Sequence, residues 1–526
     1  MPDPFIQNQS INDTYGSTHG LPVHRDYNNY LNQWKFYIRS YLGGTEYKQG
    51  LYLTRYVYES ENEYMNRLAQ ANIDNHVKSV ISIYNSFLYR QNPKRDFGWM
   101  EDSPEIKAFL EDADFEGRSF DSFIRDVNIM SSIYGHCVVL VDRPETVVGT
   151  RAEELSQGIR PYVTMYTPEN VLDWQFERMP NGHYELSYVK FLEQDERSYQ
   201  KPDEFFVRTW TRDEIILETY QLDKKDPVVA SQSKPNLLGK IPAVWVYANR
   251  SPIKGIGVSD VADICQAQRF LHECYSEAEQ LIRITNHPSL VKTNNVQASA
   301  GAGAIITMPE ELDAGLKPYL LQPSGGNLQA ILETIRETVK SIDRMAHMGA
   351  IRAIETRQMS GVAMMSEFLL LDSKLCEKAK NMELAEEQIF RAFASWSGRP
   401  FDGKIQYPTA FHIRDKNLDI DILKKAAETT RDVANASPNI KSVIDEKILE
   451  ILAKDDDEME EMQNRFADTE ETHPPMANPS QAIQHIREMI EKDGLTNEEI
   501  LTLHPEFSSL FNGDSNGDIS ESESNT

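Results

Sequence analysis

The sequence predicts an α+β fold, because the spacing of its apolar residues changes along the chain. Between about residues 120 and 133 they recur with the helical period, and between about 137 and 247 they alternate as in strands. Long stretches with the helical period follow as far as residue 396. The chain has 526 residues, too many for one hydrophobic core, so roughly three or four compact units are expected.

The N-terminal part is predicted to be helical after a mobile arm. Residues 1–30 are polar and irregular, which is typical of a terminal arm. Helices are then expected where apolar side chains keep a spacing near 3.6 residues, over Tyr30–Leu42, Glu61–Tyr89 and Ser119–Ile133. These helices would supply the first layer of the α+β unit.

The middle of this unit is predicted to be a set of strands. Six segments alternate apolar and polar residues between Pro, Asn and Gly signals: Cys137–Asp142, Tyr162–Tyr166, His183–Phe191, Phe205–Thr211, Ile215–Leu222 and Ile241–Tyr247. Pro180-Asn-Gly182 has the composition of a turn between two of them.

A long helix, a short insert and a second long helix are predicted next. Ser259 can cap a helix with Asp260 and Asp263 in its first turn, running to about Thr285 and ended by Pro288. The insert is rich in β-forming residues, at Ser289–Thr293, Ala304–Met308 and Tyr319–Gln322. The second helix covers about 327–349. By geometry alone, this pattern and the long helix that follows it favour an ordinary helical hairpin in a helical domain, with the apolar stripes of all three long helices in the core.

The rest of the chain is predicted to be helical. Ile351–Gly361 interrupts the pattern and carries Arg352 and Arg357, and a third long helix then runs to Trp396 and stops at Gly398. Helical hairpins are expected after that, beginning with Asp419–Ala436 and Ile440–Ala453. They resemble helix-turn-helix units but offer no basic recognition face, which disfavours sequence-specific DNA reading.

Motifs of enzymatic chemistry are absent from the sequence. GxxxxGK[ST], HExxH and GxSxG do not occur. Gly255-Ile-Gly257 lacks the third glycine of a dinucleotide site and is better interpreted as a flexible entry to a helix. Asp514–Asp518 begins like a calcium loop but departs from it afterwards, so a solvated tail is expected. The sequence therefore predicts no enzyme, no cofactor and no metal site.

The cysteines and the apolar runs bear on the compartment. The four cysteines form no CxxC pair and are expected to be reduced and mostly buried. The N-terminus lacks the features of a secretory signal, and no apolar run approaches the ~20 residues of a membrane helix. We therefore expect a soluble protein that is assembled in a reducing compartment.

The net charge of −28 disfavours a protein that coats DNA. This charge is unevenly distributed along the chain. Residues 258–361 hold 9 basic and 12 acidic residues, a net charge of −3. Residues 417–526 hold 9 basic and 26 acidic residues, a net charge of −17, and runs of this kind are typical of solvated faces. The acidity therefore argues against tight DNA binding more strongly than against contact with DNA.

Several segments resemble the portal proteins of tailed bacteriophages. Pro161-Tyr-Val-Thr-Met-Tyr-Thr-Pro-Glu-Asn-Val-Leu-Asp-Trp174 is similar to a strand–turn segment of that family, and Tyr134-Gly-His-Cys-Val-Val-Leu-Val-Asp142 to the strand before it. Ile241-Pro242 with Val258-Ser-Asp-Val-Ala-Asp263 is similar to the entry to the portal stem. Glu355-Thr-Arg-Gln-Met-Ser-Gly361 resembles the loop before the long interior helix. The resemblance covers about residues 33–435.

The resemblance implies a portal-type fold divided along the chain. It implies a mobile arm over 1–30, an α/β wing over 31–257, stem helices over 258–285 and 327–349, and a small β-containing clip over 286–326. A tunnel loop over 350–361, a long interior helix with the return of the wing over 362–416, a helical crown over 417–512 and an acidic disordered tail over 513–526 complete it.

The family's function and partners follow from the same resemblance. It implies a ring, usually of twelve identical subunits, at one capsid vertex of the virion, formed in the host cytoplasm with the major capsid and scaffold proteins. Double-stranded DNA would pass through the ring without sequence specificity during packaging and ejection. The terminase large subunit and later the head–tail adaptor would dock on the clip. No membrane is involved.

The resemblance also assigns candidate site residues. Arg352, Arg357 and Gln358 would face DNA in the tunnel loop. The clip residues expected to dock the terminase and the adaptor are Val291, Lys292, Thr293, Ile305, Ile306 and Tyr319.

Three other classes of protein remain open. A hydrolase or packaging ATPase is disfavoured by the missing phosphate loop. A non-enzymatic helical adaptor or scaffold protein of a virion would explain the acidic helical C-terminus, but it leaves the strand-rich region unexplained. An acidic binding module that acts as a monomer is the third.

Overall fold

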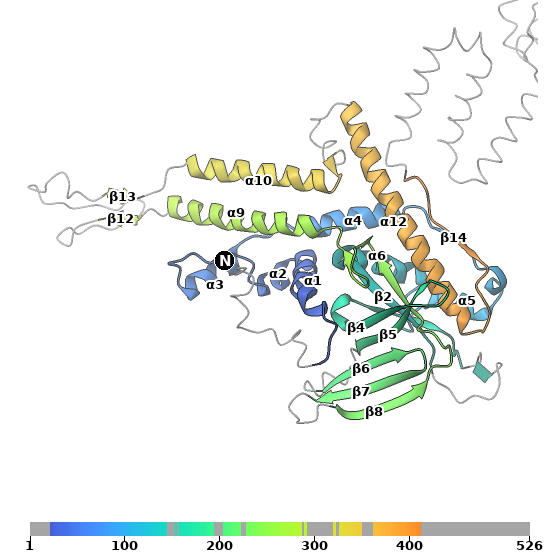
Figure 1. The fold of residues 1–526 in the computed structure, drawn as a ribbon. Helices are drawn as coiled ribbons and strands as arrows, with labels where there is room; N and C mark the ends of the chain where they lie inside the picture. Colours follow the sequence, from blue (N-terminus) through green and yellow to red (C-terminus); the bar gives the residue numbers. More distant parts are fainter. Residues whose placement is uncertain are drawn as a thin grey trace, which may run out of the picture. The chain divides into compact units, whose positions relative to one another are not determined.

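A computed structural model describes residues 21–144, 153–154, 157–193, 204–221, 228–286, 289–291, 319–321, 326–349 and 361–411. The chain divides into two compact units, Met1–Ile413 and Arg414–Thr526, and every described residue lies in the first. This unit combines helices and antiparallel sheets, so the predicted α+β class is confirmed (Figure 1). The helical hairpins predicted beyond residue 416 lie outside the described residues.

Short helices form the N-terminal part of the unit. They are α1 (Tyr27–Leu42), α2 (Gly44–Gln49), α3 (Glu61–Gln70), α4 (His76–Leu88), α5 (Pro104–Glu111) and α6 (Phe120–Tyr134). Side-chain oxygens cap α3, α4, α5 and α6 at Ser60, Asn75, Ser103 and Ser119. The prediction of one helix over Glu61–Tyr89 is wrong, because the chain leaves α3 in an extended conformation at Ala71 and Asn75 caps a new helix.

The extent of the predicted N-terminal arm also needs correction. Leu21 and Tyr27 are buried, and α1 begins at Tyr27. The hydroxyl of Tyr27 donates a hydrogen bond to the backbone oxygen of Glu169 at 2.6 Å. The segment from residue 21 to 30 therefore belongs to the folded unit. The prediction failed because it was based on the polar composition of the segment, which does not show that two of its apolar residues are buried.

Two antiparallel sheets follow α6. The first has the order β3-β2-β9, from Tyr162–Tyr166, His136–Asp142 and Ala243–Tyr247, and every residue of the central strand β2 is buried. The second has the order β4-β5-β6-β7-β8, from Val171–Arg178, Tyr184–Glu193, Glu204–Thr211, Glu214–Gln221 and Val228–Pro235. All six predicted strands are present within a few residues. Strands β4 and β8 were not predicted, and β8 is exposed along nearly its whole length, so it lacks an alternating pattern.

Smaller elements complete the body of the unit. Strand β1 (Lys94–Asp96) pairs with β14 (Lys404–Gln406), and β10 (Asn249–Arg250) pairs with β11 (Gly257–Val258). Two 3₁₀ turns occur at Gly98–Met100 and Pro168–Asn170.

Three long helices carry the chain past this body. Helix α9 (Ala262–Asn286) leads to strand β12 (Ser289–Val291), and strand β13 (Tyr319–Leu321) leads to helix α10 (Gly326–Met345). Helices α9 and α10 lie side by side, with the β12–β13 pair at their far end (Figure 1). Helix α12 (Gly361–Ser395) follows and packs on β9, β2 and α4. The predicted order of helix, β insert, helix and long helix is present in the described residues.

Candidate functional site

Helix α10 has one apolar face and one charged face. Ile335 and Ile342 are buried seven residues apart, and α9 is the main element that α10 contacts. The opposite face is exposed and carries residues of both charge signs: Glu333, Arg336, Glu337, Lys340 and Arg344. Neighbouring members of this face pair, with 2.7 Å between Lys340 Nζ and Glu337 Oε1. The pattern explains how a helix can lie on a single partner and remain hydrated elsewhere.

Helix α9 is held to the body by buried polar side chains. Gln268 and His272 are both 1% exposed. Gln268 accepts a hydrogen bond from the Val77 amide and donates one to the Ser40 backbone oxygen, each at 3.0 Å, while His272 Nδ1 lies 3.0 Å from the Asn72 backbone oxygen. The His272 ring therefore contacts the backbone through Nδ1. Burial lowers its pKa, which favours the neutral ring.

The strands at the far end of α9 and α10 bring together two of the predicted clip residues. Val291 and Tyr319 are directly opposite each other in the antiparallel pair, followed by Leu290 with Leu320 and Ser289 with Leu321. Val291 is 36% exposed. The other four predicted docking residues, Lys292, Thr293, Ile305 and Ile306, lie outside the described residues, as does the predicted strand over 304–308.

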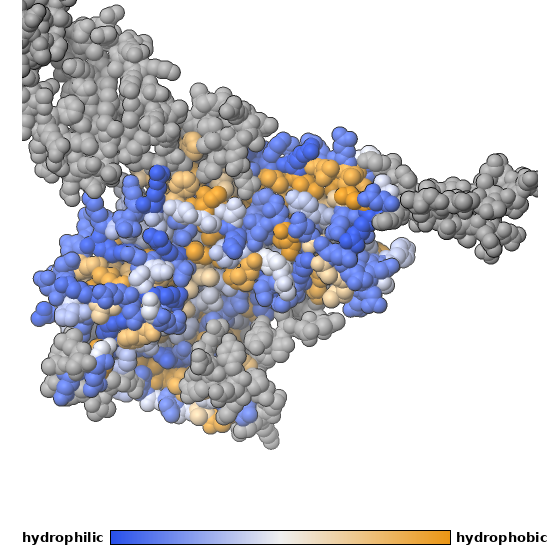
Figure 2. All heavy atoms as spheres, turned by 180° about the vertical axis from the view of Figure 1, so that it is seen from behind, coloured by the Kyte–Doolittle hydropathy of each residue, from blue (hydrophilic) through white to orange (hydrophobic). Residues whose placement is uncertain are grey.

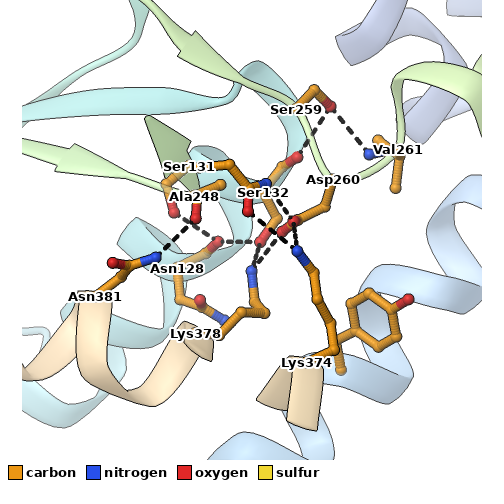
Figure 3. Close-up of polar contacts among 12 residues, drawn as sticks. Asn128, Ser131, Ser132, Ala248, Ser259, Asp260, Val261, Lys374, Lys378 and Asn381 are labelled. Atoms are coloured by element: carbon orange, nitrogen blue, oxygen red, sulfur yellow. Dashed lines mark hydrogen bonds and ion pairs between the residues drawn. The ribbon is translucent and has the colours of Figure 1, made fainter. Parts of the chain in front are cut away.

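A buried ion cluster fixes the base of α9. The side chain of Asp260 is fully buried and lies 2.5 Å from Lys378 Nζ and 3.2 Å from Lys374 Nζ (Figure 3). Its other contact is the side-chain amide of Asn249 at 2.8 Å. Burial raises the pKa of Asp260, but the two lysine charges and these hydrogen bonds outweigh it and place the pKa at about 2. The carboxylate is therefore ionised at neutral pH.

The same cluster joins three helices that are far apart in sequence. The backbone oxygen of Ser132, near the end of α6, accepts from the Asp260 amide and the Ser259 hydroxyl, each at 3.1 Å. Lys378 from α12 donates to the Ser132 hydroxyl at 2.7 Å. The Ser259 hydroxyl accepts from the Val261 amide at 3.1 Å. Because α9 begins at Ala262 and the Val261 backbone oxygen accepts the first helical hydrogen bond, from Cys265, the predicted cap at Ser259 is wrong, and this bond orders the turn before the helix. Figure 3 shows α6, α12 and the start of α9 meeting at these residues.

The segment that leads into α9 is tightly packed, contrary to the prediction of a flexible glycine entry. A Cβ on Gly257 would lie 2.1 Å from the backbone oxygen of Gly135. Gly255 has φ of +85°, and a Cβ there would lie 2.1 Å from Trp174 Nε1. The two glycines are required by close backbone approach and by a left-handed conformation, not by flexibility.

Residues that carry the family resemblance serve the packing of the body. Glu169 accepts a hydrogen bond from the Tyr134 hydroxyl at 3.1 Å. Trp174 stacks on His24 with ring centroids 4.1 Å apart and donates to the Lys254 backbone oxygen at 3.1 Å. These contacts join the second sheet to α1, α6 and the entry to α9, so the motif is structural where it is described.

The predicted DNA-facing residues Arg352, Arg357 and Gln358 lie outside the described residues. Across the described ranges, no group of three or more His, Cys, Asp or Glu side chains is arranged to hold a metal ion. Cys137, Cys265 and Cys274 are buried free thiols, and Cys376 is half-buried. None of the described helices combines the length and the apolar character that a bilayer span requires.

Comparison with known proteins finds a likeness among solved structures. No family model matches the chain, and no curated protein matches it. A solved chain from the "Virion of native gene transfer agent (GTA) particle" is similar with a TM-score of 0.37 and 8% sequence identity, over 76% of this chain and 95% of that chain.

Proposed function

We propose that the chain is the subunit of a portal ring, the head–tail connector through which DNA enters and leaves a phage-type virion. The observation that supports this proposal is the order of elements after the α+β body: helix α9, the strand pair β12–β13 and helix α10, which returns beside α9, followed by the long helix α12. The segments that resemble portal proteins occur in the same order along the chain. In this proposal α9 and α10 are stem helices, and the β12–β13 end is the clip that docks the terminase and then the adaptor.

The anchorage of α9 suits a subunit that bears a moving load. DNA that is driven through a ring exerts force on the walls, and a stem helix must transmit it to the body without bending at its base. The Asp260 cluster ties the start of α9 to α6 and α12, and before it Gly257 packs on the Gly135 backbone and Gly255 on the Trp174 ring. Such a joint is rigid because Asp260 and Lys378 have buried side chains and each charge in the cluster is paired.

The surface of the α9–α10 pair also suits a neighbour. Seen from behind, apolar side chains form a band on this pair beside charged ones (Figure 2). Exposed apolar residues of the two helices are Phe270, Ile282, Leu332 and Met345, each between 39% and 47% exposed. Side chains of this type beside paired charges are typical of surfaces that a second subunit covers.

The charge distribution suits passage of DNA better than its retention. Residues 258–361 have a net charge of −3 within a chain of −28. A channel wall with many phosphate contacts, repeated around a ring, would hold the duplex too tightly to let it move. A wall close to neutrality leaves only a few cations to touch the DNA in passing.

Images of the purified full-length chain test this proposal. We expect ring-shaped particles with an axial hole in negative stain and a matching multiple of the 60.2 kDa subunit in native mass spectrometry. A monomer or dimer at every concentration would contradict it. That outcome would favour the second candidate, a helical adaptor or scaffold protein of a virion, which the long helices and the acidic residues 417–526 also support.

A further inference from the structure

Three cations and two tyrosines gather where the β4–β5 turn meets the segment that leads into α9. Arg178 ends β4 and Tyr184 begins β5, and the two are opposite each other in the sheet. The Lys254 ammonium lies over the Tyr184 ring, and the Arg178 guanidinium carbon lies 5.9 Å from the centre of the same ring. The Arg250 guanidinium carbon lies 5.3 Å from the centre of the Tyr247 ring, and the hydroxyl of Tyr247 is hydrogen-bonded to the backbone of Gly255, the residue after Lys254. We call these five residues the cation–tyrosine patch.

The three cations of the patch are solvent-exposed, and no carboxylate among the described residues neutralises them. Arg178, Arg250 and Lys254 are all exposed, and Tyr184 is 56% exposed. Within the described part of the chain, no carboxylate lies within ion-pair distance of any of the three cations. Their contacts are with tyrosine rings, which are worth about 0.5–1 kcal/mol at exposed sites. The chain has 82 acidic and 54 basic residues, so most cations can pair with a carboxylate of the chain. Three neighbouring cations without such a pair indicate a site for an anionic ligand.

The nearest carboxylates along the sequence point elsewhere or are already paired. Glu177 and Glu185 oppose each other across β4 and β5, one residue away from the pair Arg178 and Tyr184, so they lie on the other face of the sheet. Glu177 pairs there with Arg212 at 3.5 Å. Asp260, the carboxylate nearest to Arg250 and Lys254 along the sequence, pairs with Lys374 and Lys378. The charge of the patch is therefore directed to solvent.

The segment that carries Lys254 is held rigidly, which prepares the patch for binding. Two indole nitrogens bind consecutive backbone oxygens, Trp174 to Lys254 at 3.1 Å and Trp245 to Gly255 at 3.2 Å. The Ser251 hydroxyl accepts from the Ile253 amide and donates to the Ile256 backbone oxygen. A ligand that binds here does not have to order this segment, so less of the binding free energy is lost.

We propose that the cation–tyrosine patch binds the phosphate backbone of DNA. Guanidinium groups stacked on rings keep their N–H edges free, and these edges match phosphate oxygens. Duplex DNA carries one charge per about 1.7 Å of its axis, so three cations find phosphates in any register and on any sequence. An acidic protein segment would have to match the spacing of the patch, which makes it the less favoured partner. The inference that the patch binds a polyanion rests on its contacts and exposure, and the choice of DNA as that polyanion rests on the proposed function.

Binding of a fluorescent duplex of about 25 base pairs to the full-length chain tests the inference. We compare the wild type with the triple variant R178A/R250A/K254A and with a control, K78A/K107A/R391A, which removes three exposed cations elsewhere. Anisotropy is followed between about 50 and 200 mM salt, where the affinity of each phosphate contact is expected to change steeply. Far-UV circular dichroism checks that each variant is folded.

We expect the patch variant to bind at least about tenfold more weakly at the lowest salt. The slope of log affinity against log salt should fall by about 2 to 3, since each lost contact removes about 0.9. The control should keep the affinity and the slope of the wild type. Equal loss in both triple variants would overturn the inference. So would patch-dependent binding of a polyglutamate peptide together with no patch-dependent binding of DNA.

Particle images of the same preparations separate this inference from the proposed function. If no ring forms but DNA binding depends on the patch, the inference stands and the portal proposal fails. If rings form and DNA binding does not depend on the patch, only the inference fails.

Discussion

Asp260 is the residue on which the base of α9 depends. Its carboxylate neutralises Lys378, whose side chain is 2% exposed, and Lys374, whose side chain is 23% exposed. A buried lysine without its anion is costly, because its desolvation is then uncompensated. We expect Asp260→Asn to lower the free energy of unfolding by about 3–5 kcal/mol, measured by urea denaturation. The control Glu387→Gln, which removes an exposed pair with Arg391, should cost about 1 kcal/mol or less.

Asp260 also makes the free energy of unfolding depend on pH. The pKa of Asp260 in the folded chain is about 2, below the value of about 3.9 in an unfolded one. The stabilisation is therefore complete above about pH 4 and is lost as the pH falls toward 2. We expect the difference in unfolding free energy between wild type and Asp260→Asn to shrink over this range. A difference that stays constant from pH 6 to about pH 2 would contradict the role given to Asp260.

Gly257 is required for steric reasons, which a substitution can isolate. It does not have a positive φ, so a side chain there is excluded only by the Gly135 backbone. We expect Gly257→Ala to destabilise the chain by about 1–3 kcal/mol in thermal or urea unfolding. Gly326, the first residue of α10, has no heavy atom within 4 Å of a built Cβ, and Gly326→Ala should leave stability unchanged or raise it slightly.

At the scale of elements, α10 depends on its contact with α9. Ile342 is fully buried, and Leu332 on the same helix is 40% exposed. We expect Ile342→Ala to cost about 2–5 kcal/mol and to increase amide hydrogen exchange throughout α10. Leu332→Ala should cost about 1 kcal/mol or less and leave exchange in α10 unchanged. Equal effects of the two substitutions would show that α10 is not held by its buried face.

Elements whose apolar residues recur with a regular period were predictable from the sequence. Strands that form only through hydrogen bonds to a neighbouring strand were not. The period of α6 and of α9 follows from burial of one face of each helix, so both were predicted within a few residues of their bounds. Strand β8 is exposed and gains its form from hydrogen bonds to β7, which no local pattern encodes. The break between α3 and α4 was missed because apolar spacing continues through it while Asn75 caps a new helix.

At the scale of the whole molecule, the proposed ring assigns a role to cations near its axis. Arg352 and Arg357 belong to the segment between α10 and α12, outside the described residues. If they face DNA, Arg352→Ala combined with Arg357→Ala should reduce the DNA packaged per particle or the fraction of genome retained, because their charges would contact passing phosphates. Packaging assays with the paired variant Lys78→Ala and Lys107→Ala, which removes two exposed cations of the body outside residues 258–361, provide the control. Unchanged packaging and retention would remove the role from the two arginines.

The sequence by itself determined the class of fold, the order of helix, β insert and helix, and the uneven distribution of the −28 charge. These follow from periodicity and composition, which are local properties of the chain. Only the tertiary structure decided that Lys374 and Lys378, more than a hundred residues from Asp260, complete its ion cluster. It also decided that Arg178 and Lys254 both lie against the ring of Tyr184. Contacts of this kind depend on which surfaces fold against each other, and nothing in the neighbourhood of either residue specifies that.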